Sequence, residues 1–337
     1  MINIDRPAGK MFKQFFPPPV LLSPARQRIY SAGMFRRLAL LVAVLAGWNS
    51  AAGTVRIATY NVENYLDQPT ESRHYVKSPE ARAKVRESLR ALQPDVVALE
   101  EIGSTAALLE LRAALQAEGM NFPYWDHVTG FDTNIHVAIL SKFSIVASRP
   151  HTNDFFLLDG RRFRVSRGFA EVEIQTDDHF TFTVLAAHLK SRRPTPVADE
   201  AEERLQEATV LRQIVDQHLQ ANPEARLIVL GDFNDVKNSA PLREIIGRGK
   251  LKLTDTRPAE RNGDAPSAFP ARYEARNVTW THYYAVEDTY SRIDYILCSP
   301  AMARNWQKDG TFIATVPNWG LGSDHRPLVA SFNTGKN

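Results

Sequence analysis

The sequence predicts an α/β (α+β) fold in which two packed β-sheets lie between layers of helices. Strand-like segments occur in consecutive pairs, such as 137–140 and 144–147, and helical patterns separate only some of them. A purely parallel sheet would show a stricter alternation of strands and helices. The 337 residues, 44% of them hydrophobic, suffice for one large domain or two small ones. Because nothing between residues 55 and 333 resembles a linker or a repeat, we expect a single domain over residues 53–337.

The first 52 residues predict a leader segment. Met34 opens a short basic stretch with Arg36 and Arg37, an apolar stretch follows over 38–47, and small residues end it at 50–52. An apolar stretch of about ten residues is too short to cross a bilayer, which needs roughly 20. We therefore expect a signal peptide from Met34, an extended start before it, and a periplasmic or secreted protein without a stable membrane anchor. An uncleaved anchor is the alternative.

The leader also holds the excess of basic residues. Residues 1–52 contain seven Lys or Arg and one Asp, so the net charge of +3 for the whole chain becomes −3 for the remainder. Attraction to a polyanion must therefore come from local patches. The single cysteine, Cys298, excludes an intramolecular disulfide, and its apolar neighbours predict a buried, inert thiol.

Local patterns predict the elements of the first half of the chain. Two helices, each begun by a serine cap, separate the strands. Pro79 stands at the first position of the first helix, and Pro94 ends that helix. The strands end in polar residues, since Asn61 follows the first strand and Glu100 follows the second. In order, the elements are a strand at 55–60, a helix at 78–94, a strand at 95–99, a helix at 104–119, and strands at 137–140 and 144–147.

The second half shows the same pattern of strands that end in polar residues. His188 follows one strand, and Gly231 with Asp232 follows another. The longest helical pattern begins with a cluster of acids, which the helix dipole favours. In order, the elements are strands at 169–174 and 180–187, a helix at 199–219, a strand at 227–230, a short helix at 241–246, a surface loop at 257–275, and strands at 292–298 and 327–332.

Five strand ends therefore carry polar side chains that can form one site. Asp232 and Asn234 are two residues apart, so they point to the same side of an extended chain. Carboxylates, amides and imidazoles without a thiolate suit a hard cation such as Mg²⁺, for which Mn²⁺ can substitute. This set fits the hydrolysis of a phosphate ester. The residues at the five ends are Asn61, Glu101, His188, Asp232 with Asn234, and Asp324 with His325.

Six short motifs carry a resemblance to a known family. In chain order they are TYNVEN, ALEEI, AAHLKS, LGDFND, RIDYIL and GSDHRPL. Together they resemble the endonuclease/exonuclease/phosphatase superfamily, which has the deoxyribonuclease I-like fold, over nearly all of residues 55–332. The resemblance implies a four-layer α/β/β/α sandwich of two mainly antiparallel sheets flanked by helices. It also implies a metal-dependent phosphoric ester hydrolase.

The resemblance implies a set of metal ligands. Glu101 would be the principal ligand, helped by Asn61, and Asp324 would hold the metal or a metal-bound water. Glu100 occupies a place that is often filled by Gln and would have a secondary role.

The resemblance also implies a set of catalytic residues. Asp232 would orient the attacking water or contact the metal, and Asn234 would hold a phosphate oxygen. His325 would pair with Asp294 and act as the base or as a phosphate-stabilising imidazolium. Whether His325 or Asp232 takes the proton stays open. His188 would protonate the leaving oxygen or bind phosphate.

Three further residues are expected to contact the substrate. Arg167 falls where relatives place a phosphate-contacting Arg, Lys190 begins a basic patch after His188, and Asn64 follows the first strand. In some relatives the histidine at position 188 has its own carboxylate partner, for which Asp132 is the candidate here.

Three segments allow two interpretations each. The arginines at 161–164 form either a solvated loop or a substrate contact. The aromatic residues at 280–284 either stack on a base or form a core strand, and we favour the core strand. The apolar residues at 154–158 could form a membrane-facing hairpin of the kind that sphingomyelin-cleaving relatives expose.

These observations predict an exported, Mg²⁺-dependent phosphodiesterase, monomeric, that acts on nucleic acid. The alternatives on the same fold are hydrolysis of a phospholipid, as in sphingomyelinases, or of a small phosphomonoester. A non-catalytic binding module would have lost catalytic residues, and here all of them are present.

Overall fold

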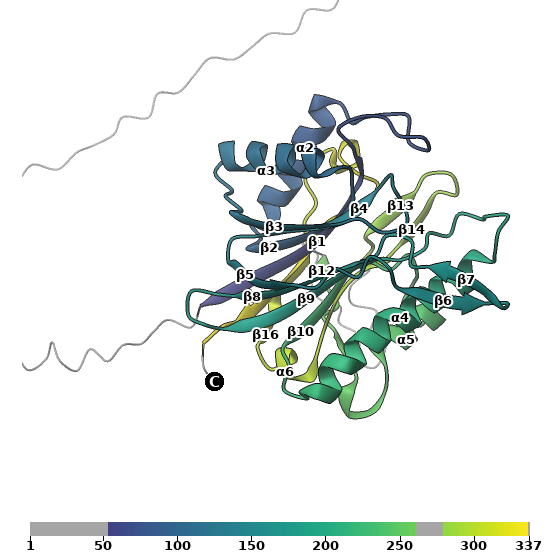
Figure 1. The fold of residues 1–337 in the computed structure, drawn as a ribbon. Helices are drawn as coiled ribbons and strands as arrows, with labels where there is room; N and C mark the ends of the chain where they lie inside the picture. Colours follow the sequence, from purple (N-terminus) through teal and green to yellow (C-terminus); the bar gives the residue numbers. More distant parts are fainter. Residues whose placement is uncertain (1–52, 261–278, 336–337) are drawn as a thin grey trace, which may run out of the picture. The chain divides into compact units, whose positions relative to one another are not determined.

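Two β-sheets packed face to face form the centre of the fold in a computed structural model, which describes residues 53–260 and 279–335 (Figure 1). The predicted leader and part of the predicted surface loop lie outside the described residues. The seven-stranded sheet has the order β12 (Ala259–Glu260), β16 (Trp306–Ile313), β17 (Leu328–Asn333), β1 (Thr54–Tyr65), β2 (Val96–Ile102), β4 (His136–Ser141), β3 (Tyr124–Val128). The six-stranded sheet has the order β11 (Thr254–Asp255), β15 (Asp294–Cys298), β10 (Leu227–Asp232), β9 (Thr181–His188), β8 (Phe169–Gln175), β5 (Ser144–Ser148).

Most neighbouring strands are antiparallel. The parallel pairs are β1 with β2, β9 with β10, and β12 with β16. Helices α2 (Pro79–Leu92) and α3 (Thr105–Ala117) cover the first sheet, and α4 (Glu200–Ala221) and α5 (Ala240–Ile246) cover the second (Figure 1). The predicted four-layer sandwich is therefore confirmed.

Short polar residues begin the main helices, as their positions in the sequence predict. The side chains of Ser78, Ser104 and Asp199 each accept a hydrogen bond from a backbone amide of the first helical turn. In the part of the chain that the structure describes, the remaining helical pieces are α6 (Pro300–Ala303) and the 3₁₀ turns Gly249–Leu251 and Trp319–Leu321. Within the described residues, every helix is too short or too polar to cross a membrane.

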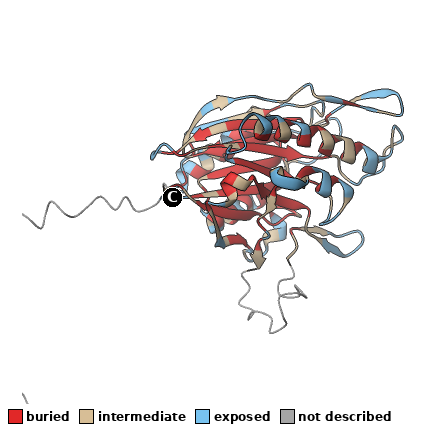
Figure 2. Ribbon diagram, turned by 90° about the horizontal axis from the view of Figure 1, so that it is seen from below, coloured by how far each residue is buried: buried red, intermediate tan, exposed pale blue. Residues whose placement is uncertain are grey.

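The core consists of three apolar layers. One lies between the two sheets, and the other two lie between each sheet and its helices. Figure 2 shows the buried residues on the strands and on the inner sides of the helices, with exposed residues on the outer faces. Helix α6 packs against the layer between the sheets through Met302, and the polar residues of the site lie at the ends of its strands.

The polar residues of the predicted site continue the layer between the sheets. On β10, Ile228 and Leu230 lie in this layer, and Asp232 is the next residue on the same face. The strand register then aligns Asp232 with His188 on β9 and with Asp294 on β15. Alternation along β10 and pairing with its two neighbours therefore place three of the predicted residues side by side.

Two hairpins lie outside the large sheets. One pairs β6 (Phe155–Leu158) with β7 (Arg161–Arg164), and the other pairs β13 (His282–Tyr284) with β14 (Thr289–Ser291). The preference for a core strand at 280–284 was wrong, because Tyr284 is 43% exposed and Tyr290 on the opposite strand is 56% exposed. The aromatic rings of this hairpin stack on each other instead, with 4.8 Å between the Tyr283 and Tyr290 centroids.

Candidate active site

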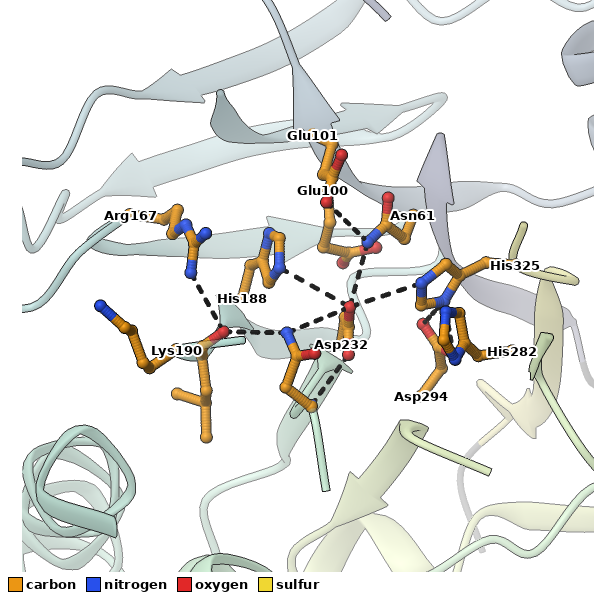
Figure 3. Close-up of polar contacts among 12 residues, drawn as sticks. Asn61, Glu100, Glu101, Arg167, His188, Lys190, Asp232, His282, Asp294 and His325 are labelled. Carbon is orange, nitrogen blue, oxygen red and sulfur yellow. Dashed lines mark hydrogen bonds and ion pairs between the residues drawn. The ribbon is translucent and has the colours of Figure 1, made fainter. Parts of the chain in front are cut away.

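Asp232 lies at the centre of the site, between two histidines (Figure 3). Its Oδ2 atom is 3.6 Å from Nε2 of His188 and 3.7 Å from Nε2 of His325. Both distances are longer than a hydrogen bond, so Asp232, His188 and His325 lie close together without hydrogen bonds between them. The same Oδ2 atom accepts a hydrogen bond from Nδ2 of Asn61 at 3.0 Å.

Asp294 orients His325. Nδ1 of His325 lies 2.9 Å from Oδ2 of Asp294, and the backbone amide of Asp294 donates to the hydroxyl of Thr281. Burial of the ring lowers the pKa of His325, but the carboxylates of Asp294 and Asp232 outweigh it and raise this pKa well above its ordinary value. The two carboxylates therefore favour the protonated form of His325, whose Nε2 faces Asp232.

His188 has the opposite protonation preference. Its ring is buried, and burial together with the charges of Arg167 and His325 holds its pKa well below the ordinary value. The prediction that Asp132 is the carboxylate partner of His188 was wrong, because Nδ1 of His188 has no hydrogen-bond partner among the described residues. Asp132 lies 3.5 Å from Nε of Arg167 instead, because the loop that carries it packs beside the arginine.

The Asp232 carboxyl is held in a buried environment. Burial raises its pKa to about 6, although the positive charge of His325 acts in the opposite direction. Its Oδ1 atom accepts from the backbone amide of Asn234 at 2.8 Å. The side-chain amide of Asn234 donates to the carbonyl of Leu189 at 3.0 Å, so this residue fixes the loop after β10.

A β-bulge turns Glu101 into the site. The register of β2 against both neighbours shifts between Glu100 and Ile102, and Glu101 has a φ of +62°. Its carboxylate accepts from the backbone amide of Asn64 at 3.0 Å and from Nδ2 of Asn61 at 3.4 Å. Glu100 is buried between the sheets, where it accepts from Thr59 and where burial raises its pKa well above the usual range.

Asp324 lies on the open side of the site. Its side chain is 41% exposed, and its backbone amide donates to Glu63 at 3.2 Å. Burial acts to raise the pKa of Asp324, but His282 and His325 lower it overall. Asn64 accepts a hydrogen bond from Nε of Arg73 at 2.7 Å. Because its backbone amide donates to Glu101, Asn64 helps to hold the Glu101 carboxylate in place.

The predicted substrate residues have different surroundings. Arg167 is almost fully buried and donates to the carbonyl of Leu189 at 3.2 Å, next to His188 (Figure 3). The ammonium group of Lys190 instead lies 3.1 Å from the carboxylate of Glu203 on α4. The structure therefore brings Arg167 next to His188, whereas Lys190 already has a counter-charge.

Three contributors were missed by the sequence prediction. The ring of His282 on β13 lies 4.6 Å from the ring of His325, centroid to centroid, with the two ring planes tilted by 43°. Arg73 holds Asn64, and the hydroxyl of Ser323 bridges the Asn61 carbonyl and the His325 amide. The only signal for Ser323 was its place next to Asp324. His282 was considered only as one of the aromatic residues at 280–284 that could stack on a base, and Arg73 gave no signal because it lies on an irregular segment.

The family follows from a comparison with known families. The model of the endonuclease/exonuclease/phosphatase family matches residues 58–325, which include every residue of the site described above. The chain belongs to the endonuclease/exonuclease/phosphatase family. It is therefore a metal-dependent phosphoric ester hydrolase. A search of curated proteins gives no match.

Solved structures share the fold of this family member at low sequence identity. Human Nocturnin, as its catalytic domain with bound sulfate, is 16% identical with a TM-score of 0.57, covering 84% of this chain and 95% of Nocturnin. Truncated TDP2 from Caenorhabditis elegans is 17% identical with a TM-score of 0.55, covering 83% and 97%. Sphingomyelinase C from Streptomyces griseocarneus is 20% identical with a TM-score of 0.52, covering 83% and 100%. Because these identities are low, the similarities establish the fold alone.

The family implies a divalent metal ion, and the donor set fits one. Glu101 and Asp324 supply carboxylate oxygens, and Asn61 lies between Glu101 and Asp232. Glu101 is partly buried, yet it accepts hydrogen bonds only from the neutral amides of Asn61 and Asn64, and it has no cationic partner among the described residues. A carboxylate without a counter-charge at the mouth of a site is a suitable ligand for a hard cation.

Proposed function

We propose that this family member is an exported, Mg²⁺-dependent phosphodiesterase that cleaves nucleic acid. The observation that carries the proposal is the pair of histidines on either side of Asp232, whose pKa values are shifted in opposite directions by their surroundings. Hydrolysis of a phosphodiester needs a group that accepts a proton from water, and cations that stabilise charge on the phosphoryl oxygens. Asp232, His325 and His188 supply these functions within one buried cluster.

The side chains suggest a division of roles. The imidazolium of His325 donates from Nε2 to a phosphoryl oxygen, while Asp294 keeps the ring charged and oriented. The carboxylate of Asp232 is the group that can accept a proton from the attacking water at neutral pH. Neutral His188 and charged Arg167 lie on the opposite side, where a leaving oxygen would be stabilised.

Glu101, Asn61 and Asp324 would hold the metal ion. When bound, Mg²⁺ supplies charge neutralisation at the phosphoryl oxygens. The choice of Mg²⁺ rests on the carboxylate oxygens of Glu101 and Asp324, which are donors that Mg²⁺ and Mn²⁺ prefer. Asn61 would contribute its side-chain oxygen, which in this structure accepts a hydrogen bond from the backbone amide of Glu63 at 2.9 Å.

Two surfaces next to the site support a nucleic acid substrate. A groove beside Asp324 is lined by Tyr283, Tyr284 and Trp319, whose rings can stack on unpaired bases. On the other side, the outer face of the β6–β7 hairpin carries Arg162 and Arg164, and no carboxylate among the described residues pairs with either of them. Unpaired guanidinium groups attract the phosphate backbone.

The same hairpin favours a second candidate, a phospholipid substrate. Phe155 and Leu157 alternate with the arginines on its outer face and are 48% and 64% exposed. Exposed apolar residues beside cations also suit an anionic membrane surface. The nucleic acid is preferred, because the aromatic groove on the opposite side of the site matches bases, and because the guanidinium of Arg162 already covers the Phe155 ring at 3.6 Å.

A panel of substrates tests the proposal. Purified mature protein is incubated with plasmid DNA, RNA, sphingomyelin and a generic phosphodiester, each with Mg²⁺ and with EDTA. We expect EDTA-sensitive cleavage of at least one nucleic acid, and a loss of several orders of magnitude in each of four alanine variants. Cleavage of sphingomyelin alone would select the lipid candidate, and near-normal turnover in all four variants would defeat the assignment. The four variants replace Glu101, His188, Asp232 and His325.

Export and the monomeric state are tested separately. Amino-terminal sequencing of the protein recovered outside the cytoplasm should show a start near residue 53, and an intact residue 1 would contradict a cleaved leader. Light scattering of the mature protein should give the mass of a monomer, and a dimer mass would contradict that part of the proposal.

A further inference from the structure

Three side chains converge on one point at the open edge of the site. His282, Asp324 and His325 come from the β13–β14 hairpin and from the loop before β17, and their nearest ligand atoms lie within 4.8 Å of one another. Nε2 of His282 is 3.6 Å from Oδ2 of Asp324, and Nε2 of His325 is 3.8 Å from Oδ1 of Asp324. These separations are too long for hydrogen bonds, so the three groups face a common point without bonding to one another.

The separations match those of a tetrahedral metal site. Zinc binds His nitrogen and carboxylate oxygen at about 2.0 to 2.2 Å, which puts two ligand atoms of a tetrahedron about 3.4 Å apart. The two observed separations exceed this value by only a few tenths of an ångström, but they end on the two different oxygens of Asp324. A small rotation of the side chains would bring one of these oxygens and both nitrogens, which lie within 4.8 Å of one another, to a common ion. Because the Asp324 side chain is 41% exposed, the fourth position would face solvent.

The backbone holds His282 in this place. The amide of Tyr283 donates to the carbonyl of Asp324 at 3.0 Å, and the amide of Arg326 donates to the carbonyl of Thr281 at 2.6 Å. These two bonds form a short antiparallel bridge that aligns His282 with His325. The two imidazoles are therefore preorganised relative to each other, which lowers the entropic cost of binding an ion.

We propose that His282, Asp324 and His325 form a binding site for a transition metal ion of the Zn²⁺ class, and that an ion bound there inhibits the hydrolase. Two imidazoles and one carboxylate favour such an ion over Mg²⁺, which prefers oxygen donors. The bound ion would take the lone pair of Nε2 of His325, the nitrogen that lies 3.7 Å from Oδ2 of Asp232. The ion therefore occupies the nitrogen that would contact a phosphoryl oxygen, and it lies at the open edge where the substrate approaches Asp232. The inhibition rests on the proposed function, whereas the binding of the ion does not.

The test measures Zn²⁺ binding directly and hydrolysis separately. Titration calorimetry with Zn²⁺ alone compares the unaltered protein with His282→Ala and with His282→Gln, which keeps a polar group but is a poor zinc ligand. The matched control is His179→Asn, which removes an exposed imidazole from the β8–β9 turn, where φ is +62° and Asn is tolerated. Circular dichroism checks that each variant is folded.

We expect one site in the unaltered protein and in the control, and at least tenfold weaker binding in both His282 variants. The Zn²⁺ concentration that halves Mg²⁺-supported hydrolysis should rise by at least the same factor in these variants. Equal binding by the unaltered protein and by folded His282→Gln would overturn the site. If binding depends on His282 but inhibition does not, the inhibitory role is wrong and the site stands. If no phosphodiester is cleaved, the proposed function fails while the calorimetry still decides the site.

Discussion

Replacing Asp232 by Asn should stabilise the metal-free protein while it removes turnover. The Asp232 carboxyl is 1% exposed, and burial raises its pKa from 3.8 to about 6. A carboxyl with a raised pKa binds its proton more tightly in the folded chain than in the unfolded chain. Its ionisation therefore costs stability: the cost is absent below about pH 4, grows as the pH rises to about 6, and is complete above that value.

The size of the effect follows from this pKa and from the hydrogen bonds of the carboxyl. A rise from 3.8 to about 6 corresponds to about 3 kcal/mol of unfavourable free energy at neutral pH. Asn cannot accept from both the Asn61 amide and the Asn234 backbone amide, and the lost hydrogen bond costs about 1 kcal/mol. The expected gain in the free energy of unfolding is therefore about 2 kcal/mol.

Urea denaturation of the unaltered protein and Asp232→Asn in EDTA measures this gain. It should be complete at pH 8 and should shrink as the pH falls from 6 to 4. The control is Asp177→Asn, which changes an exposed acid in the β8–β9 turn and should leave stability unchanged. A variant that is less stable than the unaltered protein at pH 8, or a gain that does not depend on pH, would refute the reasoning.

Three further predictions concern the charge on the second histidine, the metal and the hairpin. Asp294→Asn should lower the pKa of His325, because the carboxylate that raises it is lost. The kcat should fall by about 10² to 10⁴, and the alkaline limb of the pH profile of kcat should move to lower pH. An alkaline limb that does not move would contradict this role of Asp294. Glu101→Gln should raise the Mg²⁺ concentration for half-maximal activity at least tenfold, as measured by metal titration. Circular dichroism should show that the variant is folded. An unchanged dependence of activity on Mg²⁺ would exclude Glu101 as a ligand. Arg162→Ser combined with Arg164→Ser should weaken binding of single-stranded DNA. The slope of the logarithm of the DNA association constant against the logarithm of the salt concentration should fall in magnitude by about 1.4, and hydrolysis of a small phosphodiester should stay unchanged. An equal loss of activity on the small substrate would instead place the arginines in the reaction.

Much of the site could be predicted because its residues are tied to local patterns. A strand of period two that ends in Asp232 must continue its buried face with that residue, and the same holds for His188 after β9. The helix caps at Ser78 and Ser104 are equally local. The motifs then identified the family, because each of them spans a strand end and the polar residues beside it.

Other features depend on contacts between distant segments. No local pattern places Asp132 against Arg167 rather than His188, since the loop that carries Asp132 is positioned by the strands on either side of it. The ion pair of Lys190 with Glu203 arises only because α4 packs beside the end of β9. A basic residue in the sequence does not reveal whether an acid will neutralise it.

The amino-acid pattern predicts which residues stand at strand ends, which face of each strand is buried, and which family the chain resembles. The pairing of Asp232 in register with His188 and Asp294, the bulge that turns Glu101 inward, and the approach of His282 to Asp324 and His325 emerge only in the folded chain. The difference lies in the range of the interactions. Alternation and capping act within a few residues, whereas register, bulges and edge hairpins are set by hydrogen bonds and packing between segments far apart in the chain.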